Sequence, residues 1–387
     1  MSDPRAGRWR RTRRVALGVA VALVVVEVAL RVARPPLLEA IRQRTFRVER
    51  ADADYITLQS INFDPRDGEA LIVYDPDCFW RMAPDREGEF FLTPRVRTNA
   101  LGLRGPEVGA RVPGELRLLC VGDSVTFGFG VAEDERFSDR LAASLSAAHP
   151  ERRWTTVNAG VIGFSSFQVA SCLDEWLAAV EPDVVLVTLG VNDSLLTATC
   201  DRDFQALASA PAARLRHSLR GSQTWCALEG GLAWLARAVD GWRTGRPRAV
   251  VHWLDYPSLP QGPGRVPRGS EADVLAALAA IDARCRERAV ELVLVSEFTS
   301  AEVPSLGRLD AGYFDRIERL TNTIARWAAE RGLRFADVRG VLGRSGRPHA
   351  ELLRDFCHPT PAGHVLIADE LARVGEEAGW PTRRRER

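Results

Sequence analysis

Short apolar runs and longer amphipathic stretches alternate along the chain from residue 116 to residue 377. The apolar runs predict strands at 116–121, 154–158, 184–189, 292–296 and 334–338, and a further strand or sheet edge at 250–254. The stretches between them predict helices at 133–148, 166–180, 271–289, 313–331 and 361–377. Strands that alternate with helices indicate an α/β fold, with a doubly wound, mainly parallel sheet sandwiched by helices.

The regions outside this alternation divide the chain further. Residues 34–114 contain only strand-like fragments between Asp, Pro, Gly and Arg, so we expect a connector or accessory region there. Residues 115–380 are expected to form the main domain, interrupted by a mostly helical insertion at about 194–248. Residues 381–387 are rich in arginine and predict a solvated, disordered basic tail.

The N-terminus has the pattern of a membrane-targeting segment. Arginines concentrate in residues 1–14, and a mainly aliphatic stretch follows at 15–33. A helix of about 19 residues rises about 28 Å, which is close to the thickness of the hydrocarbon layer of a membrane. Glu27 is the costly residue in this stretch, and Arg31 follows one helical turn later, where it can pair with the carboxylate.

This pattern predicts a transmembrane signal anchor rather than a soluble helix. The sequence has no small-residue cleavage site and no lipobox cysteine after the apolar stretch, so we expect the helix to be retained. The arginines at the extreme N-terminus predict that this end lies inside the cell, with the main domain in the periplasm or outside the cell. A cleaved signal peptide is the alternative.

Overall charge and cysteine spacing exclude several classes of function. The net charge is +1, so the chain lacks the strong overall positive charge that is typical of proteins that bind nucleic acid. The cysteines form no Cys-x-x-Cys pair and show no spacing typical of a metal site, and we expect neither a metal ion nor another cofactor. Cys200 and Cys226 flank part of the insertion and are candidates for a disulfide only in an oxidising compartment.

Residues that can carry chemistry follow two of the predicted strands and recur near the C-terminus. Ser124 lies in Gly-Asp-Ser just after the first strand, at the sheet edge where open α/β folds bind ligands. Asn192 lies in Gly-Val-Asn-Asp after the strand at 184–189. Asp355 and His358 are three residues apart, so one short turn can bring the carboxylate to the imidazole. A serine needs a base to become nucleophilic, and an Asp–His pair supplies one.

These blocks, together with Asn-Ala-Gly-Val-Ile-Gly at 158–163, resemble the SGNH (GDSL-type) hydrolase family over about residues 115–375. Segment 98–105 resembles the lead-in of membrane-anchored members, although its role stays open. The resemblance implies a flavodoxin-like fold and a serine esterase in which Ser124, Asp355 and His358 are catalytic. The absence of a Gly-x-Ser-x-Gly elbow around the serine argues against the α/β-hydrolase family.

The same resemblance implies an oxyanion hole. Its donors would be the backbone N–H groups of Ser124 and Gly163 and the side-chain amide of Asn192, with Gly160 as the alternative to Gly163. Asp123 and Asp193 are expected to support the loops beside the site through hydrogen bonds to the backbone.

The expected activity is hydrolysis of small O-acyl esters, above all O-acetyl esters, on substrates such as a cell-surface polysaccharide. Three alternatives use the same residues differently: an acyltransferase acting on polysaccharide, a lipid-directed esterase or lysophospholipase, and a catalytically silent binding scaffold. The sequence leaves open the acyl chain length, the natural substrate and the oligomeric state. The expected partners are an acyl ester or acylated glycan and, through the N-terminal helix, a membrane.

Overall fold

A computed structural model describes residues 4–33, 71–197, 200–208, 222, 224, 225, 228 and 266–380, except 76, 91 and 306–308. The chain divides into two compact units, residues 1–53 with 209–255 and residues 54–208 with 256–387. The strand predicted at 250–254, the basic tail and Cys226 lie outside the described residues. Cys200 is described and is a free thiol.

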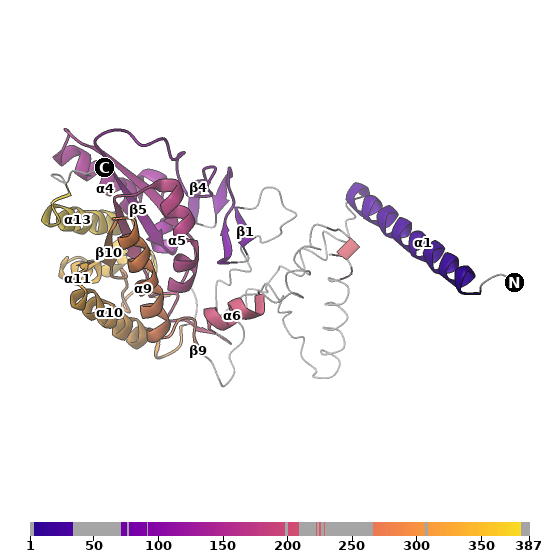
Figure 1. The fold of residues 1–387 in the computed structure, drawn as a ribbon. Coiled ribbons are helices and arrows are strands. Elements are labelled where there is room, and N and C mark those ends of the chain that lie inside the picture. The colour runs from indigo at the N-terminus through magenta and orange to yellow at the C-terminus, as the bar shows by residue number, and fades with distance from the viewer. Residues whose placement is uncertain are drawn as a thin grey trace. The chain divides into compact units, whose positions relative to one another are not determined.

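A five-stranded parallel sheet forms the centre of the larger unit (Figure 1). Its order is β11-β10-β7-β5-β6, with bounds Arg334–Ala336, Glu291–Val295, Val184–Thr188, Glu115–Gly122 and Arg153–Gly160. Counted along the chain, this is the 2-1-3-4-5 order of the flavodoxin-like fold, so the predicted doubly wound sheet is confirmed. Strand order reverses between β5 and β7, and ligands bind beyond the carboxyl ends of strands at such a point.

Helices cover both faces of the sheet because the apolar side chains of its central strands alternate between the faces. In β5, Leu118 and Cys120 pack with one cluster, whereas Leu119 and Val121 pack with the other. The first cluster joins α4 (Phe137–Ala148), α11 (Val338–Arg344) and α13 (Pro361–Glu377) to the sheet. The second joins α5 (Ser166–Val180), α9 (Glu271–Glu287) and α10 (Tyr313–Glu330) to the sheet.

The predicted helices are all present, with small differences at their ends. The stretch predicted as one helix at 133–148 is a 3₁₀ turn, Glu133–Glu135, followed by α4. Arg136 separates them in an extended conformation at the start of α4, and its buried guanidinium donates to the carbonyl of Arg104, 2.8 Å away. Within the predicted insertion, the structure describes the short strand β8 (Leu196–Thr197), which pairs with β9 (Val266–Pro267), and α6 (Asp201–Ala208).

The accessory region contains two antiparallel hairpins whose apolar side chains enter the core of the main domain. β1 (Ile72–Asp75) pairs with β2 (Phe79–Met82), and β3 (Glu87–Phe90) pairs with β4 (Thr93–Arg97). Phe79, Trp80 and Phe90 belong to the same buried cluster as α5 and one face of β5. This region is therefore packed against the elements that lead to the sheet's carboxyl edge.

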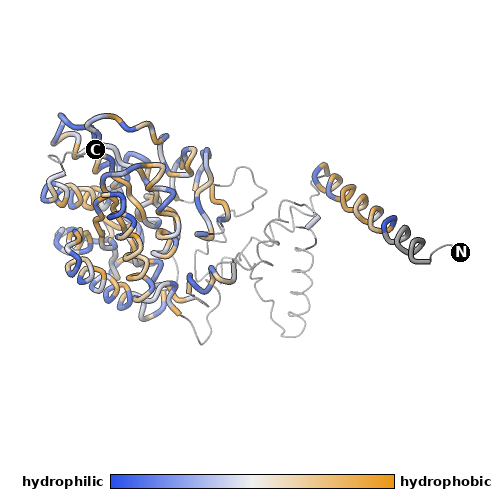
Figure 2. The backbone as a smooth tube through the Cα atoms, viewed as in Figure 1, coloured by the Kyte–Doolittle hydropathy of each residue, from blue (hydrophilic) through white to orange (hydrophobic). Residues whose placement is uncertain are grey.

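The smaller unit contains α1 (Pro4–Ala33), which is apolar over most of its length (Figure 2). Residues Arg13–Val32 are long and apolar enough to span a membrane, with a mean hydropathy of 2.4. Glu27, in this span, accepts a hydrogen bond from Arg31 Nε at 2.8 Å. Its other oxygen accepts from the hydroxyls of Ser222 and Thr224 and from the Thr224 N–H, at 2.8–2.9 Å. The carboxylate is therefore satisfied by residues of the same unit.

Candidate active site

Ser124 is the first residue of a short helix, α3 (Ser124–Phe127), that follows β5 directly. The Asp123 carboxylate caps this helix by accepting the N–H of Val125 at 2.9 Å. Gly122 is required at the bend because a Cβ there would lie 2.6 Å from the Thr188 carbonyl oxygen. This sharp turn carries the Ser124 hydroxyl beyond the end of the strand.

Arg104 also holds the turn that carries Ser124, and it lies in the segment at 98–105 whose role the sequence left open. Its Nη1 donates to the carbonyl oxygens of Phe127 and Gly128, both at 2.7 Å, and its Nη2 donates to that of Val131 at 2.9 Å. These carbonyls include the C-terminal groups of α3, which have no partner inside so short a helix. Burial, together with the charge of Arg136, lowers the pKa of Arg104 to about 9.

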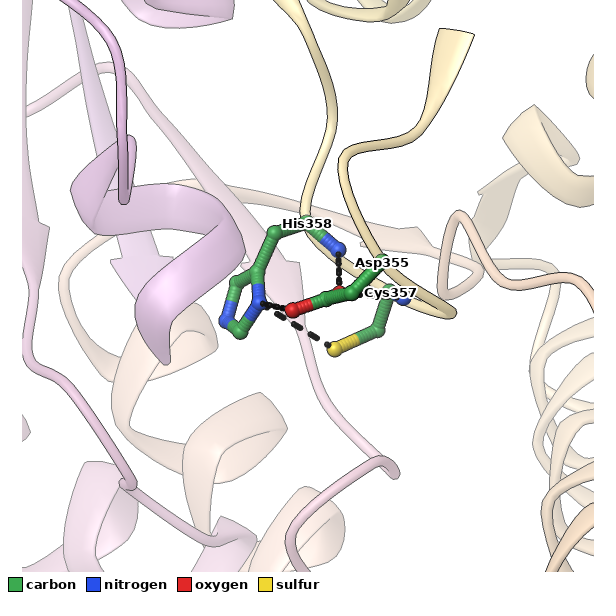
Figure 3. A group of neighbouring side chains, drawn as sticks. All are labelled: Asp355, Cys357 and His358. Atoms are coloured by element: carbon green, nitrogen blue, oxygen red, sulfur yellow. Dashed lines mark hydrogen bonds and ion pairs between the residues drawn. The ribbon is translucent and has the colours of Figure 1, made fainter. Parts of the chain in front are cut away.

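Asp355 and His358 lie in one tight turn after α12 (His349–Leu352), opposite Ser124. One oxygen of Asp355 accepts the backbone N–H of Cys357 and that of His358, at 3.0 and 2.9 Å. Its other oxygen lies 2.6 Å from His358 Nδ1, as Figure 3 shows. His358 Nε2 lies 2.8 Å from the Ser124 hydroxyl oxygen, and the Phe129 ring packs against the imidazole. The three side chains therefore form one continuous chain of hydrogen bonds.

This arrangement keeps Asp355 ionised. Burial alone would raise the pKa of its carboxyl group, but the hydrogen bond and charge of His358 and the two backbone N–H groups lower it below its ordinary value. An ionised carboxylate at Nδ1 holds the proton on that nitrogen and leaves Nε2 as an acceptor toward Ser124. His358 Nε2 is therefore placed to accept the proton of the Ser124 hydroxyl.

Cys357 lies beside this pair, with its sulfur 3.8 Å from His358 Nδ1 (Figure 3). The ligand atoms of Asp355, Cys357 and His358 lie within 4.8 Å of one another, a set that could hold a metal ion. Burial together with the negative charge of Asp355 raises the pKa of the Cys357 thiol well above its ordinary value. His358 Nδ1 and the Asp355 oxygen, two of the three ligand atoms, are hydrogen-bonded to each other at 2.6 Å, and this pairing is the one that the Asp–His arrangement uses.

Asn192 lies at the same edge of the sheet, after β7. Its side-chain Nδ2 donates to the Asp123 carboxylate at 2.8 Å, so one of its two amide hydrogens is committed, and no described residue accepts the other. Asp123 thus contacts both α3, which begins with Ser124, and the candidate oxyanion donor Asn192, which is more than the loop support expected from the sequence. Burial raises the pKa of Asp123 to about 6, although the Val125 N–H and the charge of His358 oppose the rise.

Gly163 and Gly160 differ in the availability of their backbone N–H groups. The N–H of Gly160 donates to the Asn158 side-chain oxygen at 3.1 Å. A Cβ on Gly160 would also lie 2.2 Å from the backbone nitrogen of Phe127, so this glycine lets β6 approach α3 closely. Among the described residues, no hydrogen bond occupies the N–H of Gly163. This difference favours Gly163 as a donor to a ligand.

Asp193 connects the loop after β7 to the start of α5. Its carboxylate accepts the Ser166 hydroxyl at 2.7 Å and the Ser166 backbone N–H at 3.1 Å. Burial raises the pKa of Asp193 to about 6 against the effect of these bonds, which lower it. These contacts are of the supporting kind that we expect for Asp193.

Sequence reasoning missed Glu297, a fully buried carboxylic acid just after β10. Its Oε1 accepts the N–H of Val191 at 3.1 Å, and its Oε2 has no hydrogen-bond partner among the described residues. Burial raises the pKa of Glu297 well above its ordinary value, and the charge of Asp123 adds to the rise. Glu297 thus fixes the loop that carries Asn192, and nothing in its local sequence signals this role.

Comparison with known proteins agrees with the motifs. The model of the GDSL-like Lipase/Acylhydrolase family matches residues 120–366. The fold is similar to that of an acetylxylan esterase from Geobacillus stearothermophilus, at 17% identity over 67% of this chain and 93% of the other, with a TM-score of 0.41. An alpha/beta hydrolase enzyme from the metagenome of Lake Arreo is similar at 19% identity over 67% and 95%, also with a TM-score of 0.41. No curated protein matches the chain in sequence.

Proposed function

The chain belongs to the GDSL-like lipase/acylhydrolase family and is a hydrolase of ester bonds, and we propose that Ser124, His358 and Asp355 form its catalytic triad. The observation that carries this proposal is the unbroken hydrogen-bond chain from the Ser124 hydroxyl through His358 to Asp355, with distances of 2.8 and 2.6 Å. The carboxyl edge of β5, beside the reversal in strand order, supplies a place for substrate.

In the first half-reaction, the Ser124 oxygen attacks the acyl carbonyl carbon while His358 Nε2 takes the hydroxyl proton. The resulting imidazolium is stabilised by the Asp355 carboxylate. The tetrahedral intermediate then collapses, its bond to the alcohol oxygen breaks, and His358 returns the proton to the departing alcohol. Water repeats the sequence on the acyl-serine, giving the free acid and restoring the Ser124 hydroxyl.

The negative charge on the intermediate's oxygen would be stabilised by Ser124 N–H, Gly163 N–H and the free amide hydrogen of Asn192. Ser124 N–H is available because it lies at the start of α3, where helix N–H groups lack an intrahelical partner. Asp123 orients the Asn192 amide and Asp193 supports the loop through Ser166. These fixed donors need no reorganisation during the reaction.

We further propose that the substrates are small O-acyl esters, in particular O-acetyl esters on a cell-surface polysaccharide. Full-length protein in detergent would be assayed with short p-nitrophenyl esters, acetylated glycans and lysophospholipids, with and without an acceptor sugar. We expect release of acetate and modification of Ser124 by a fluorophosphonate, mapped by peptide mass spectrometry. Acyl-sugar formation would indicate a transferase, preference for lysophospholipids a lipid-directed enzyme, and no turnover with an unlabelled Ser124 a binding scaffold.

The membrane part of the proposal is that α1 is a retained anchor, with the catalytic domain exported. The support is Glu27: Ser222 and Thr224 bind its carboxylate, and a signal peptide removed during export would lose these contacts. Full-length protein should pellet with membranes and resist carbonate extraction, whereas a chain beginning near Leu37 should stay in the supernatant. A reporter fused after Arg387 should be active outside the cytoplasm, and a cytoplasmic reporter would contradict the orientation.

A further inference from the structure

The loop that carries Gly163 is a tight turn whose middle peptide can face either of two ways. Phe164 N–H donates to the Val161 carbonyl at 3.1 Å, which closes a β-turn with Ile162 and Gly163 at its centre. Gly163 has a φ of +76°, the value of the third residue of a type II turn. Type I and type II turns differ mainly by a flip of the central peptide, here the one joining Ile162 to Gly163.

The direction of the Gly163 N–H depends on this peptide. In a trans peptide the carbonyl of one residue and the N–H of the next point in opposite directions. Whatever binds the Ile162 carbonyl therefore also sets where the Gly163 N–H points. A flip would turn this N–H away from the position it has in the type II turn.

Trp80, from the accessory hairpin β1–β2, binds that carbonyl. Its indole Nε1 donates to the Ile162 oxygen at 2.9 Å, and the side chain is only 2% exposed. The indole ring also packs against Phe164, the last residue of the turn. Trp80 is thus fixed by a hydrogen bond to the peptide that must not flip and by packing against the last residue of the turn.

Arg268 holds the neighbouring carbonyl. Its Nη1 donates to the Gly163 oxygen at 2.7 Å, while its other guanidinium nitrogens bind the buried carboxylate of Asp201. Val161 N–H, at the start of the turn, donates to the Gly122 carbonyl at 3.0 Å, so the turn runs beside the residues that lead to Ser124. The carbonyls on both sides of Gly163 N–H are therefore held from within the protein, and the N–H itself is left for a ligand.

We propose that Trp80 is a positioning residue for the oxyanion hole: its indole N–H keeps the turn at 161–164 in the type II form and so aims the Gly163 N–H at the substrate oxygen. This inference rests on the proposed esterase function and on Gly163 as a donor. It gives the accessory region a part in the reaction.

The test is Trp80→Phe, which removes the indole N–H and keeps an aromatic side chain. The matched control is Trp154→Phe, because Trp154 also donates to a carbonyl, that of His149 at 3.3 Å, but at the opposite end of β6. Both variants would be assayed with a p-nitrophenyl ester, and active enzyme would be counted by fluorophosphonate titration so that loss of folded protein does not enter kcat.

We expect Trp80→Phe to lower kcat about tenfold, less than the loss of a whole donor, while KM changes less than twofold. Affinity for an arylboronic acid, which forms a tetrahedral adduct with serine, should fall by the same factor as kcat. The pH dependence of kcat/KM should not move, because the His358 side of the site is untouched. Trp154→Phe should leave kcat and boronate affinity at the wild-type values.

Equal kcat values for the two variants, or a loss confined to KM with unchanged boronate affinity, would overturn the role of Trp80. If Trp80→Phe does not fold, β-(3-benzothienyl)alanine at position 80 keeps the shape of the indole without its N–H and is subject to the same expectations. If the wild-type protein neither hydrolyses esters nor is labelled at Ser124, the proposed function itself is wrong. The two failures are therefore distinguishable.

Discussion

The proposed base side and the proposed oxyanion side of Ser124 are built in different ways. On the base side, Asp355 and His358 are three residues apart, and the backbone N–H groups of their own turn bind the carboxylate. On the oxyanion side, the carbonyls around Gly163 are bound by Trp80 and Arg268, which are 82 and 105 residues from their partners in the chain. One side is thus a local structure and the other is assembled by tertiary packing.

This difference indicates which substitutions should disturb the geometry of each side. A local turn keeps its geometry as long as a few neighbouring residues are kept, whereas a turn held from a distance depends on the packing of the whole domain. We therefore expect the base side to respond to few substitutions and the oxyanion side to many, including some in the accessory region.

The largest effect is expected where both sides meet. Ser124→Ala removes the proposed nucleophile, and kcat should fall by about 10⁴-fold or more, to background, with loss of fluorophosphonate labelling. The protein should still fold, since no bond of the turn at 122–128 uses the Ser124 hydroxyl apart from that with His358 among the described residues. Activity near the wild-type value would place the nucleophile elsewhere and end the comparison of the two sides.

A smaller effect is expected from the oxyanion side alone. Asn192→Ala should lower kcat by about 10²–10³, or about 2.7–4 kcal/mol, with a much smaller change in KM. The matched control, Asp193→Ala, should reduce the free energy of unfolding more than it reduces turnover, because Asp193 binds Ser166 and not the substrate. A change confined to KM at Asn192 would mean that it binds the ground state, and another donor would have to be found.

The smallest expected effect is on the pH dependence of stability and comes from the buried carboxyl group of Asp193 at this edge of the sheet. The pKa of Asp193 in the folded protein is about 6, above its ordinary value of 3.8, so the folded state holds this proton more tightly. The stability that comes from holding this proton is complete below about pH 4 and is lost as the pH rises through 6, a fall of about 2–3 kcal/mol.

Urea unfolding at pH 4.5 and pH 7.5 would measure this fall, and Asp193→Asn should make it smaller. Asp174→Asn is the control, because Asp174 lies half-exposed on α5, away from this edge of the sheet, and the fall linked to Asp193 should remain in this variant. An unchanged pH dependence in Asp193→Asn would show that this carboxyl is ionised in the folded state at little cost.

The sheet could be predicted because its strands are apolar on both faces, and the helices α5 and α13 begin and end where their periodicity and caps indicate. The motif residues around Ser124, Asn192 and His358 could also be found, since each follows a strand or lies in a short turn. Glu297, Arg104 and Trp80 could not, because their partners are the backbone groups of segments far away in the chain. The residues next to a buried arginine or tryptophan in the sequence do not indicate which carbonyl its side chain will bind.

The contact between Trp80 and Ile162 also bears on how the enzyme could be trimmed for laboratory use. A fragment beginning at residue 115 would retain the whole parallel sheet together with Ser124, Asp355 and His358, and would look complete by its motifs. It would lack the indole at the Ile162 carbonyl and the guanidinium of Arg104 at the turn that carries Ser124. The shortest fragment suitable for expression therefore starts before β1. A transfer of this activity to another scaffold would have to include both hairpins together with the active site.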